Sequence, residues 1–397
     1  MAESNRIQPL DSVRGIASMV VVIFHTLISF PIFYAAFNYL PYNGNQAVKL
    51  LNDTPLHILW AGPEAVLLFF VLSGFVLSIP YLQNTSLPYS GYIIRRFFRI
   101  YIPYIVVMII YIIIVSALNN YNQISSLSVQ FNGRWNQPVT GNSIISYIFM
   151  LGNDKSNVNG VIWSLVHEMR ISIIFPFLMI LIKRFNLRQI IMYTATPSIL
   201  ICIFLKYIAE HIPSVTASQL SQSAGDTFYY CLFFIIGASL CKYRLNIKAV
   251  INPLKPVYKV FLLIAAILLI EFRWLLPGVF NKTSEALSFI RGGVTGDWVA
   301  GIGVALLFIV ILNSIKLSNF LSRGIFVWIG KVSYSLYLVH VLVIMLCARY
   351  LGQVIPLKLS LLIAPLLALP VAYISFRYIE KPAMEIGRRL SARFKRG

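Results

Sequence analysis

Long apolar runs recur along nearly the whole chain and constrain its fold more than any other feature of the sequence. A run of ~20 predominantly apolar residues is long enough to cross a bilayer as one helix. About ten runs meet this criterion, near residues 12–35, 58–81, 100–118, 161–182, 189–208, 227–242, 257–275, 298–314, 326–349 and 358–378. Because a backbone in lipid must satisfy its own hydrogen bonds, the runs predict an all-α fold, a polytopic membrane helical bundle of about ten transmembrane helices.

The composition agrees with this fold and excludes a soluble globular enzyme, because only 12% of the residues are charged against ~25% in soluble domains. The net charge of +20 comes from short basic clusters beside the apolar runs. This positive-inside pattern indicates a lipid bilayer, and not a nucleic acid, as the partner. The clusters alternate with loops that are poor in bases, so both the N- and C-termini are predicted to be cytoplasmic.

We divide the chain into an integral-membrane domain, residues 1–382, and a basic cytoplasmic tail, residues 383–397. The first apolar run has no small-residue cleavage site, so we expect it to remain as the first span. The four cysteines show no spacing typical of metal ligands. No metal site is predicted, and the thiols are interpreted as reduced packing residues.

The longest predicted loop, residues 119–160, is rich in Asn, Ser and Gln and contains Trp135. Loops of this length are usually functional or disordered. On the outer face, such a loop would suit carbohydrate, because sugars offer hydroxyls and apolar faces. A solvated connector explains the same composition equally well.

The first apolar run contains a polar stripe formed by Asp11, Arg14, Ser18 and His25. Arg14 and His25 lie ~16 Å apart along a helix axis and face within ~20° of each other. Each alone could be structural, with Arg14 marking the cytoplasmic end and His25 buried and satisfied. Ionisable groups within a span are costly and default to function, so the whole stripe indicates a functional site.

The fourth run places Ser164, Glu168 and Ser172 on one helix face. Glu168 and His25 are predicted to lie at comparable depth in the outer half of the bilayer. A carboxylate near a histidine raises the basicity of the imidazole and fixes its tautomer. The structural alternative for Glu168 is a pair with Arg170 or another buried base.

Three arginines, Arg95, Arg96 and Arg99, occupy one turn before the third run, on the predicted cytoplasmic side. Guanidinium groups bind phosphates bidentately, so this turn suits a phosphorylated ligand; interfacial anchoring is the plainer alternative. Ser73 and Gly74 are predicted to permit close helix packing.

Several segments, in order, resemble the signature of the membrane acyltransferase-3 family. They are Leu10-Asp11-Ser12-Val13-Arg14-Gly15-Ile16-Ala17 with Phe24-His25, Phe69-Phe70-Val71-Leu72-Ser73-Gly74-Phe75, Arg95-Arg96-Phe97-Phe98-Arg99-Ile100, Trp163-Ser164-Leu165-Val166-His167-Glu168, Ser333-Tyr334-Ser335-Leu336-Tyr337 with His340, and Glu380-Lys381-Pro382. The resemblance covers residues 10 to about 382. It implies a multi-pass enzyme of the bacterial inner membrane that transfers an acyl group, usually acetyl from acetyl-CoA, to a hydroxyl of a surface or secreted carbohydrate, such as a lipopolysaccharide or exopolysaccharide.

The resemblance also implies roles for the candidate residues. His25 would be the general base and Glu168 its catalytic partner, although acylation of His25 itself stays open. The candidate acyl-CoA ligands are Arg14, Arg95, Arg96 and Arg99, and the candidate acceptor ligands are His340, Tyr337 and Trp163. Glu64, just inside the second run from the outer side, is a further candidate acceptor ligand, but the family usually has other residues there, so the resemblance implies no role for it. Glu64 could instead pair with a base, and His340 could be structural. No tightly bound cofactor is expected; acetyl-CoA is a co-substrate that arrives from the cytoplasm, and the carbohydrate arrives from the opposite side.

The main alternative is a multi-span transporter or flippase of a glycan or small anion. Transporters often show repeated halves with broken helices at matching positions, and this sequence shows no such repeat. A sensor or scaffold without activity is a second alternative, which the combination of His25, Glu168 and the arginines disfavours.

Overall fold

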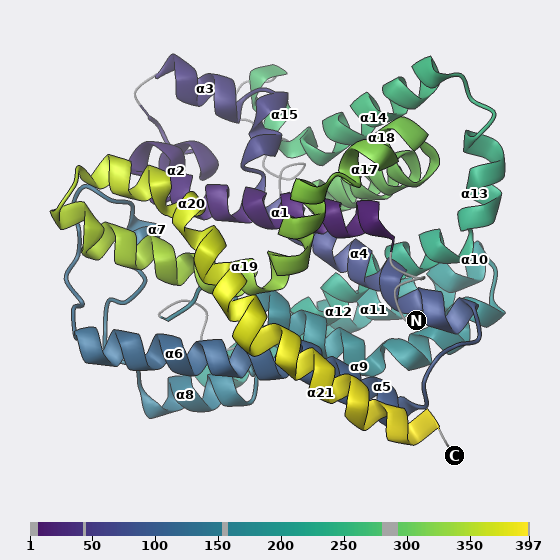
Figure 1. The fold of residues 1–397 in the computed structure, drawn as a ribbon, viewed down its shortest axis with the longest axis horizontal. Helices are drawn as coiled ribbons and strands as arrows, with labels where there is room; N and C mark the ends of the chain where they lie inside the picture. Colours follow the sequence, from purple (N-terminus) through teal and green to yellow (C-terminus); the bar gives the residue numbers. More distant parts are fainter. Residues whose placement is uncertain (1–6, 43–44, 153–157, 280–292, 396–397) are drawn as a thin grey trace. The chain divides into compact units, whose positions relative to one another are not determined.

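A computed structural model describes residues 7–42, 45–152, 158–279 and 293–395 of the chain (Figure 1). Within these ranges all regular elements are helices and no strand occurs, which confirms the predicted all-α class. The chain forms two compact units. The first comprises Met1–Leu72, Ser126–Ser128 and Tyr243–Ser333, and the second comprises Ser73–Ser125, Val129–Lys242 and Tyr334–Gly397.

The first unit contains the N-terminal helices and a later helical block. Its elements are α1 (Gln8–Leu27), α2 (Pro31–Phe37), α3 (Gln46–Asn52), η1 (Pro55–Leu59), the first part of α4 (Gly62–Leu82), α13 (Arg244–Ile251), α14 (Pro256–Ile270), α15 (Phe272–Val279), α17 (Gly293–Asn313), α18 (Ile315–Leu321) and the start of α19 (Gly324–Arg349). Helices α14 and α17 lie side by side (Figure 1). A Cβ at Gly303 would lie 2.7 Å from the Ile270 backbone nitrogen, so a small residue is what permits this approach.

The second unit contains the remaining helices. Its elements are the end of α4, α5 (Tyr89–Arg96), η2 (Phe97–Tyr101), α6 (Ile102–Leu118), α7 (Val129–Asn132), α8 (Gly141–Ile148), α9 (Trp163–Arg184), α10 (Leu187–Ile190), η3 (Ile191–Ala195), α11 (Thr196–His211), α12 (Val215–Lys242), most of α19, η4 (Leu351–Gln353), α20 (Leu357–Ser375), η5 (Phe376–Glu380), α21 (Lys381–Ala392) and η6 (Arg393–Lys395). The predicted tail, residues 383–397, begins inside α21, and residues 396–397 lie outside the described ranges.

Nine helical stretches among the described residues are long and apolar enough to cross a membrane. They are Gln8–Leu27, Gly62–Leu82, Tyr89–Leu118, Trp163–Arg184, Leu187–His211, Val215–Lys242, Val294–Asn313, Gly324–Gln353 and Leu357–Ala392. The remaining predicted run, 257–275, corresponds to the shorter helix α14, which ends at Ile270 before Glu271. Its 15 residues span only ~22 Å, less than the ~30 Å of a bilayer core. The chain is a multi-pass membrane protein.

One predicted loop was wrong. Residues 209–226 were expected to connect two spans, but α12 begins at Val215. Two hydroxyls explain why this polar stretch is helical: Ser218 Oγ donates to the Ala209 carbonyl at 2.6 Å and Ser221 Oγ donates to the Leu205 carbonyl at 2.7 Å. Their polarity is satisfied against α11, so it does not interrupt the helix.

Close packing in the second unit centres on Gly74. A Cβ at this position would collide with the carbonyl group of Phe234 in α12, which confirms the prediction that Ser73 and Gly74 permit close helix contact.

The long loop is packed as well: Trp135 is 1% exposed and its indole nitrogen donates to the Val158 carbonyl at 3.1 Å. Trp135 is therefore a core residue and is not available as a surface for a sugar.

Candidate functional site

Arg14 is held by three groups of the first unit. Its guanidinium donates to Ser333 Oγ at 2.9 Å and to the Gly330 carbonyl at 3.0 Å, and it lies 3.1 Å from the Asp11 carboxylate. The backbones are close here, because a Cβ at Gly15 would lie 2.5 Å from the Gly330 nitrogen. Arg14 therefore stabilises the crossing of α1 and the start of α19 in addition to any contact with a ligand.

His25 lies near the C-terminal end of α1 and is 9% exposed. Its ring centroid is 5.0 Å from that of Phe24, in an edge-on arrangement. Phe24 in turn stacks on Trp60, at 6.1 Å between centroids. A cluster of aromatic side chains thus fixes the helix turn that carries the imidazole, which is the requirement for a group that must meet a reacting atom in one orientation.

Glu64 is buried and paired with a base of the same unit. Its Oε1 accepts a hydrogen bond from the Trp274 indole at 3.0 Å and lies 3.5 Å from Arg273 Nε. Arg273 also forms an ion pair with Asp297. Of the two readings of Glu64, the structure therefore places it in a buried ionic network, and a contact with acceptor stays a prediction.

His57 and Glu271 form a second buried pair beside this network, with 2.8 Å between His57 Nδ1 and Glu271 Oε2. Both side chains are 0% exposed, and Glu271 lies beyond the end of α14, outside the long helices. Burial, and then the Arg273 charge, lowers the pKa of His57. Burial, and then Glu64, raises the pKa of Glu271. Both shifts favour a neutral pair, in which the Glu271 carboxylic acid donates to His57.

We expect Glu271→Gln to be tolerated and to remove a pH dependence of stability. The glutamine amide can still donate a hydrogen bond to His57, and unlike the carboxyl group it does not have to be protonated first. Because folding raises the pKa of Glu271, wild-type stability is lost as the pH rises above the ordinary glutamate value of ~4.3. The apparent Tm of Glu271→Gln, relative to wild type, should rise by roughly 2 °C or more between pH 5.5 and 8.5.

The measurement is thermal unfolding in detergent by intrinsic fluorescence across that pH range. Glu210→Gln is the matched control, because Glu210 is exposed at the end of α11. The difference between its Tm and that of wild type should not change with pH. A flat difference for Glu271→Gln as well would show that Glu271 is ionised in the folded protein.

Glu168 is the centre of a polar cluster in the second unit. Its Oε1 accepts a hydrogen bond from Ser73 Oγ at 3.1 Å, and its charge acts on Arg96 and on Tyr334. Arg170 lies elsewhere: it donates to Ser223 Oγ at 3.0 Å and to the Leu151 carbonyl at 2.7 Å. The predicted structural pair of Glu168 with Arg170 is thus not formed, and Arg96 is the nearby base.

Two of the three arginines, Arg95 and Arg96, end α5, and Arg99 lies within the π-helical turn η2 that follows. Arg95 donates to Ser391 Oγ at 2.8 Å and Arg99 contacts Met384 Sδ at 3.6 Å. Both partners belong to α21, so Arg95 and Arg99 share a helix face as their spacing predicts. Arg96 instead lies over the Tyr92 ring, 5.8 Å from its centroid.

The π-helical turn η2 is held by a hydrogen bond from α19. The Tyr334 hydroxyl donates to the Ile100 carbonyl at 2.7 Å, and a second π-helical turn, η5, presents Glu380 to Ser335 Oγ at 2.7 Å. Such turns occur mostly inside α-helices and frequently at functional sites. Of the π-helical turns, η2 overlaps a segment that carries the family resemblance, η5 meets another at Glu380, and η3 lies outside these segments.

Two candidate acceptor ligands on α19 are deeply buried. His340 is 0% exposed, and its Nδ1 lies 3.2 Å from the Leu336 carbonyl. The Tyr337 hydroxyl is 2.7 Å from Ser164 Oγ and donates to the Val161 carbonyl at 3.1 Å. Tyr337 thus joins α19 to the start of α9. Direct contact of either residue with acceptor stays a prediction.

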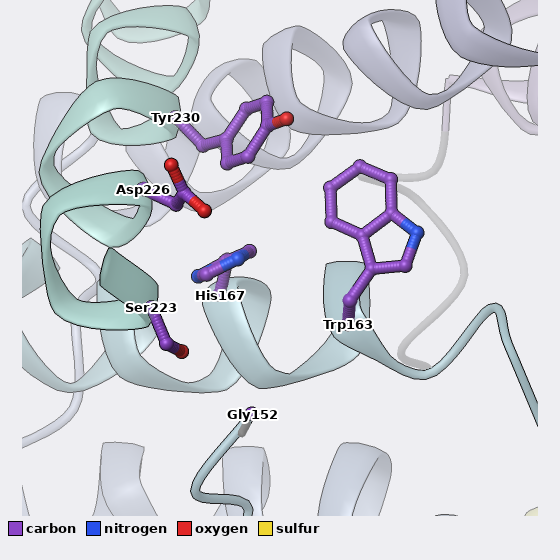
Figure 2. A pocket seen from close by; sticks show the side chains of 6 residues that line it. All are labelled: Gly152, Trp163, His167, Ser223, Asp226 and Tyr230. Carbon is purple, nitrogen blue, oxygen red and sulfur yellow. The ribbon is translucent and has the colours of Figure 1, made fainter. Parts of the chain in front are cut away.

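Trp163 lines a pocket of about 320 Å³ between α9 and α12 (Figure 2). The other lining residues are Gly152, His167, Ser223, Asp226 and Tyr230. Of the predicted site residues, Trp163 alone lines this pocket. His167, for which the sequence predicted no role, lies at its centre.

The candidate residues divide between the two units. Arg14, His25 and Glu64 belong to the first, and the second contains Arg95, Arg96, Arg99, Glu168, Trp163, Tyr337 and His340. Sequence reasoning missed Glu271 and Asp226. Glu271 could have been found, because a single acid within the apolar run 257–275 is costly in lipid and therefore marks a special position. Asp226 could not have been found in this way, because it lay in a stretch that was interpreted as a loop. Among the described residues, no three His, Cys, Asp or Glu side chains gather as metal ligands.

Comparison with known proteins gives one clear result. A sequence model described as an acyltransferase domain matches residues 7–377. No curated protein and no solved structure matches the chain.

Proposed function

Because this chain belongs to the membrane acyltransferase-3 family through residues 7–377, we propose that it moves an acyl group from cytoplasmic acyl-CoA to a hydroxyl of an extracytoplasmic carbohydrate. Acetyl is the proposed acyl group and the bacterial inner membrane the proposed location. The family match favours this enzyme over the transporter that the sequence left as an alternative.

The observation that supports acyl-CoA as the donor most directly is the group of three arginines at the end of α5 and in η2. Arg95 is exposed, while Arg96 and Arg99 are half-buried, so three guanidinium groups with different exposure lie within five residues of the chain. Coenzyme A carries a 3′-phosphate and a pyrophosphate, and arginine forks match phosphate oxygens in a bidentate manner. In this proposal the turn holds the nucleotide part of acyl-CoA.

The chemical step is assigned to His25. The neutral imidazole takes the proton of the acceptor hydroxyl as its oxygen attacks the thioester carbonyl. A C–O bond forms and the C–S bond breaks, so coenzyme A leaves as a thiolate that takes the proton from His25. Glu168 is the second residue that we expect catalysis to need, as a carboxylate held by Ser73 and acting on Arg96.

The donor site is tested by measuring acetyl-CoA binding to detergent-purified protein by calorimetry. The triple variant Arg95→Ala/Arg96→Ala/Arg99→Ala should bind at least roughly tenfold more weakly, because it loses charge-assisted hydrogen bonds to phosphate. The control is Lys183→Ala/Arg184→Ala/Arg188→Ala, which removes three exposed positive charges from another predicted cytoplasmic segment and should bind like wild type.

Equal weakening in both triple variants would mean that acetyl-CoA responds only to general positive charge. Unchanged binding in the η2 variant would place the donor site elsewhere. No binding of any acyl-CoA to folded wild-type protein would contradict the proposed donor.

A further inference from the structure

The pocket between α9 and α12 has the features of a site for one sugar ring. We propose that it binds a neutral pyranose unit of the carbohydrate acceptor. The identification of this sugar as acceptor rests on the proposed function, whereas the ligand class is argued from the pocket itself. Trp163 lies at the start of α9, and Gly152 belongs to the long loop that the charge pattern assigns to the outer side.

Aromatic rings form the walls of this pocket. The centroids of Trp163 and Tyr230 are 5.3 Å apart with 41° between the ring planes, and those of His167 and Tyr230 are 5.2 Å apart with 38° between them. Figure 2 shows the indole of Trp163 standing across the pocket from Asp226, with His167 between them. Inclined rings of this kind offer apolar faces against which the C–H face of a sugar can pack.

Polar groups complement the aromatic walls. Asp226 and Ser223 line the same pocket and can accept or donate hydrogen bonds to ring hydroxyls. His167 is oriented by Thr227, whose Oγ1 lies 2.9 Å from His167 Nδ1. A few placed polar groups in a largely aromatic setting are the usual composition of a small-ligand site.

The charges around the pocket select a neutral ligand. Asp226 and Lys206 form an ion pair at 2.9 Å, so this pair has no net charge that would draw a cation or an anion into the pocket. The nearby Arg170 donates to Ser223, Thr227 and two backbone carbonyls, and these bonds direct its charge into the protein.

The size of the pocket suits one sugar ring. Its volume of about 320 Å³ is at the low end of the ~300–1,000 Å³ of small-molecule sites. One boundary is set by Gly152, which has φ +71°, and where a Cβ would collide with Ser223 Oγ. Only glycine adopts this conformation without strain, so the backbone approaches the pocket without a side chain that would fill it.

The proposal is tested with methyl α-D-glucopyranoside, methyl α-D-galactopyranoside and methyl α-D-mannopyranoside as probes. Binding to the detergent-purified full chain is measured by saturation-transfer NMR, and acetyl-CoA binding is measured on the same samples. At least one pyranoside should bind wild type, and Trp163→Ala should weaken it by roughly tenfold or more. Tyr193→Ala is the control, because Tyr193 is exposed on η3 and does not line the pocket, and it should bind the pyranoside like wild type. Asp226→Asn is a second test variant of unchanged shape, and roughly tenfold weaker binding is expected for it as well.

Each outcome bears on a different statement. Loss of pyranoside binding in Trp163→Ala and Asp226→Asn, with acetyl-CoA binding intact, supports the site. Acetyl-CoA binding by wild type without binding of any pyranoside overturns the sugar site and leaves the proposed function standing. Choline chloride that binds wild type and displaces the pyranoside would also overturn it, because the pocket would then be a cation site. Pyranoside binding without acetyl-CoA binding would keep the sugar site and contradict the proposed donor.

Discussion

Replacement of His25 by alanine is expected to lower kcat for acyl transfer roughly 10²–10⁴-fold, the range that general bases contribute. Binding of acetyl-CoA should stay within about twofold of wild type, because the proposed phosphate ligands lie on η2 and its flanks. The measurement is the release of free coenzyme A from acetyl-CoA by purified protein, in the presence of a pyranoside acceptor that the protein binds.

The matched control for this variant is His211→Ala, because His211 is exposed at the end of α11 and has no role in the proposed mechanism. Its activity should equal that of wild type. Full activity in His25→Ala would refute the assignment of His25 as base. Equal loss in both variants would point to a general effect of histidine removal on the protein in detergent.

The same assay can separate the two routes that the sequence left open. In direct transfer, wild-type protein mixed with acetyl-CoA alone carries no acyl group after quenching. In a two-step route, mass spectrometry would find acetyl on the peptide that contains His25. We expect the direct route, in which the imidazole carries only a proton.

The second large effect is expected for Gly74→Ala. The new methyl group would collide with the backbone carbonyl of Phe234, and a backbone cannot move aside as a side-chain end can. Overpacking of this kind costs ~1–3 kcal/mol or more, so we expect a markedly lower apparent Tm and a smaller yield of monodisperse protein. Thermal unfolding and size-exclusion chromatography in detergent measure both.

Gly141→Ala is the matched control, because nothing lies within 4 Å of a Cβ at Gly141 and the residue is helical. Gly141 is the first residue of α8, where alanine is accepted without strain, so this variant should be as stable as wild type. If Gly74→Ala behaved like Gly141→Ala, the helices at Gly74 would not be in backbone contact.

The helical class and most of the spans could be predicted from composition and run length, because a bilayer permits few alternatives. The predictions failed where polarity was read as a loop. Residues such as Ser218 and Ser221 looked like a connector, yet they donate to carbonyls of α11 and continue the helix. The number of long helices also depended on one residue, Glu271, which follows the end of α14.

The partners of the candidate residues could not be predicted in the same way. Arg170 was the natural base for Glu168 by sequence distance, but it bonds to α12 and to the loop before α9. Trp135 looked like a surface aromatic and is buried. The partner of a side chain depends on which helices pack together and on how each is rotated about its axis. The periodicity of one helix in the sequence does not give this information.

The sequence by itself determined that this protein is a helical membrane protein and, through its ordered motifs, that it is an acyltransferase. Those properties depend on local composition and on short motifs that can be read directly from the chain. Only the tertiary structure decided that Arg95 and Arg99 bond to α21, that Glu64 is paired with Arg273, and that Trp163 faces Asp226 across a pocket. The physical reason is that hydrogen bonds, ion pairs and pockets form between residues far apart in sequence, and helix packing alone brings these together.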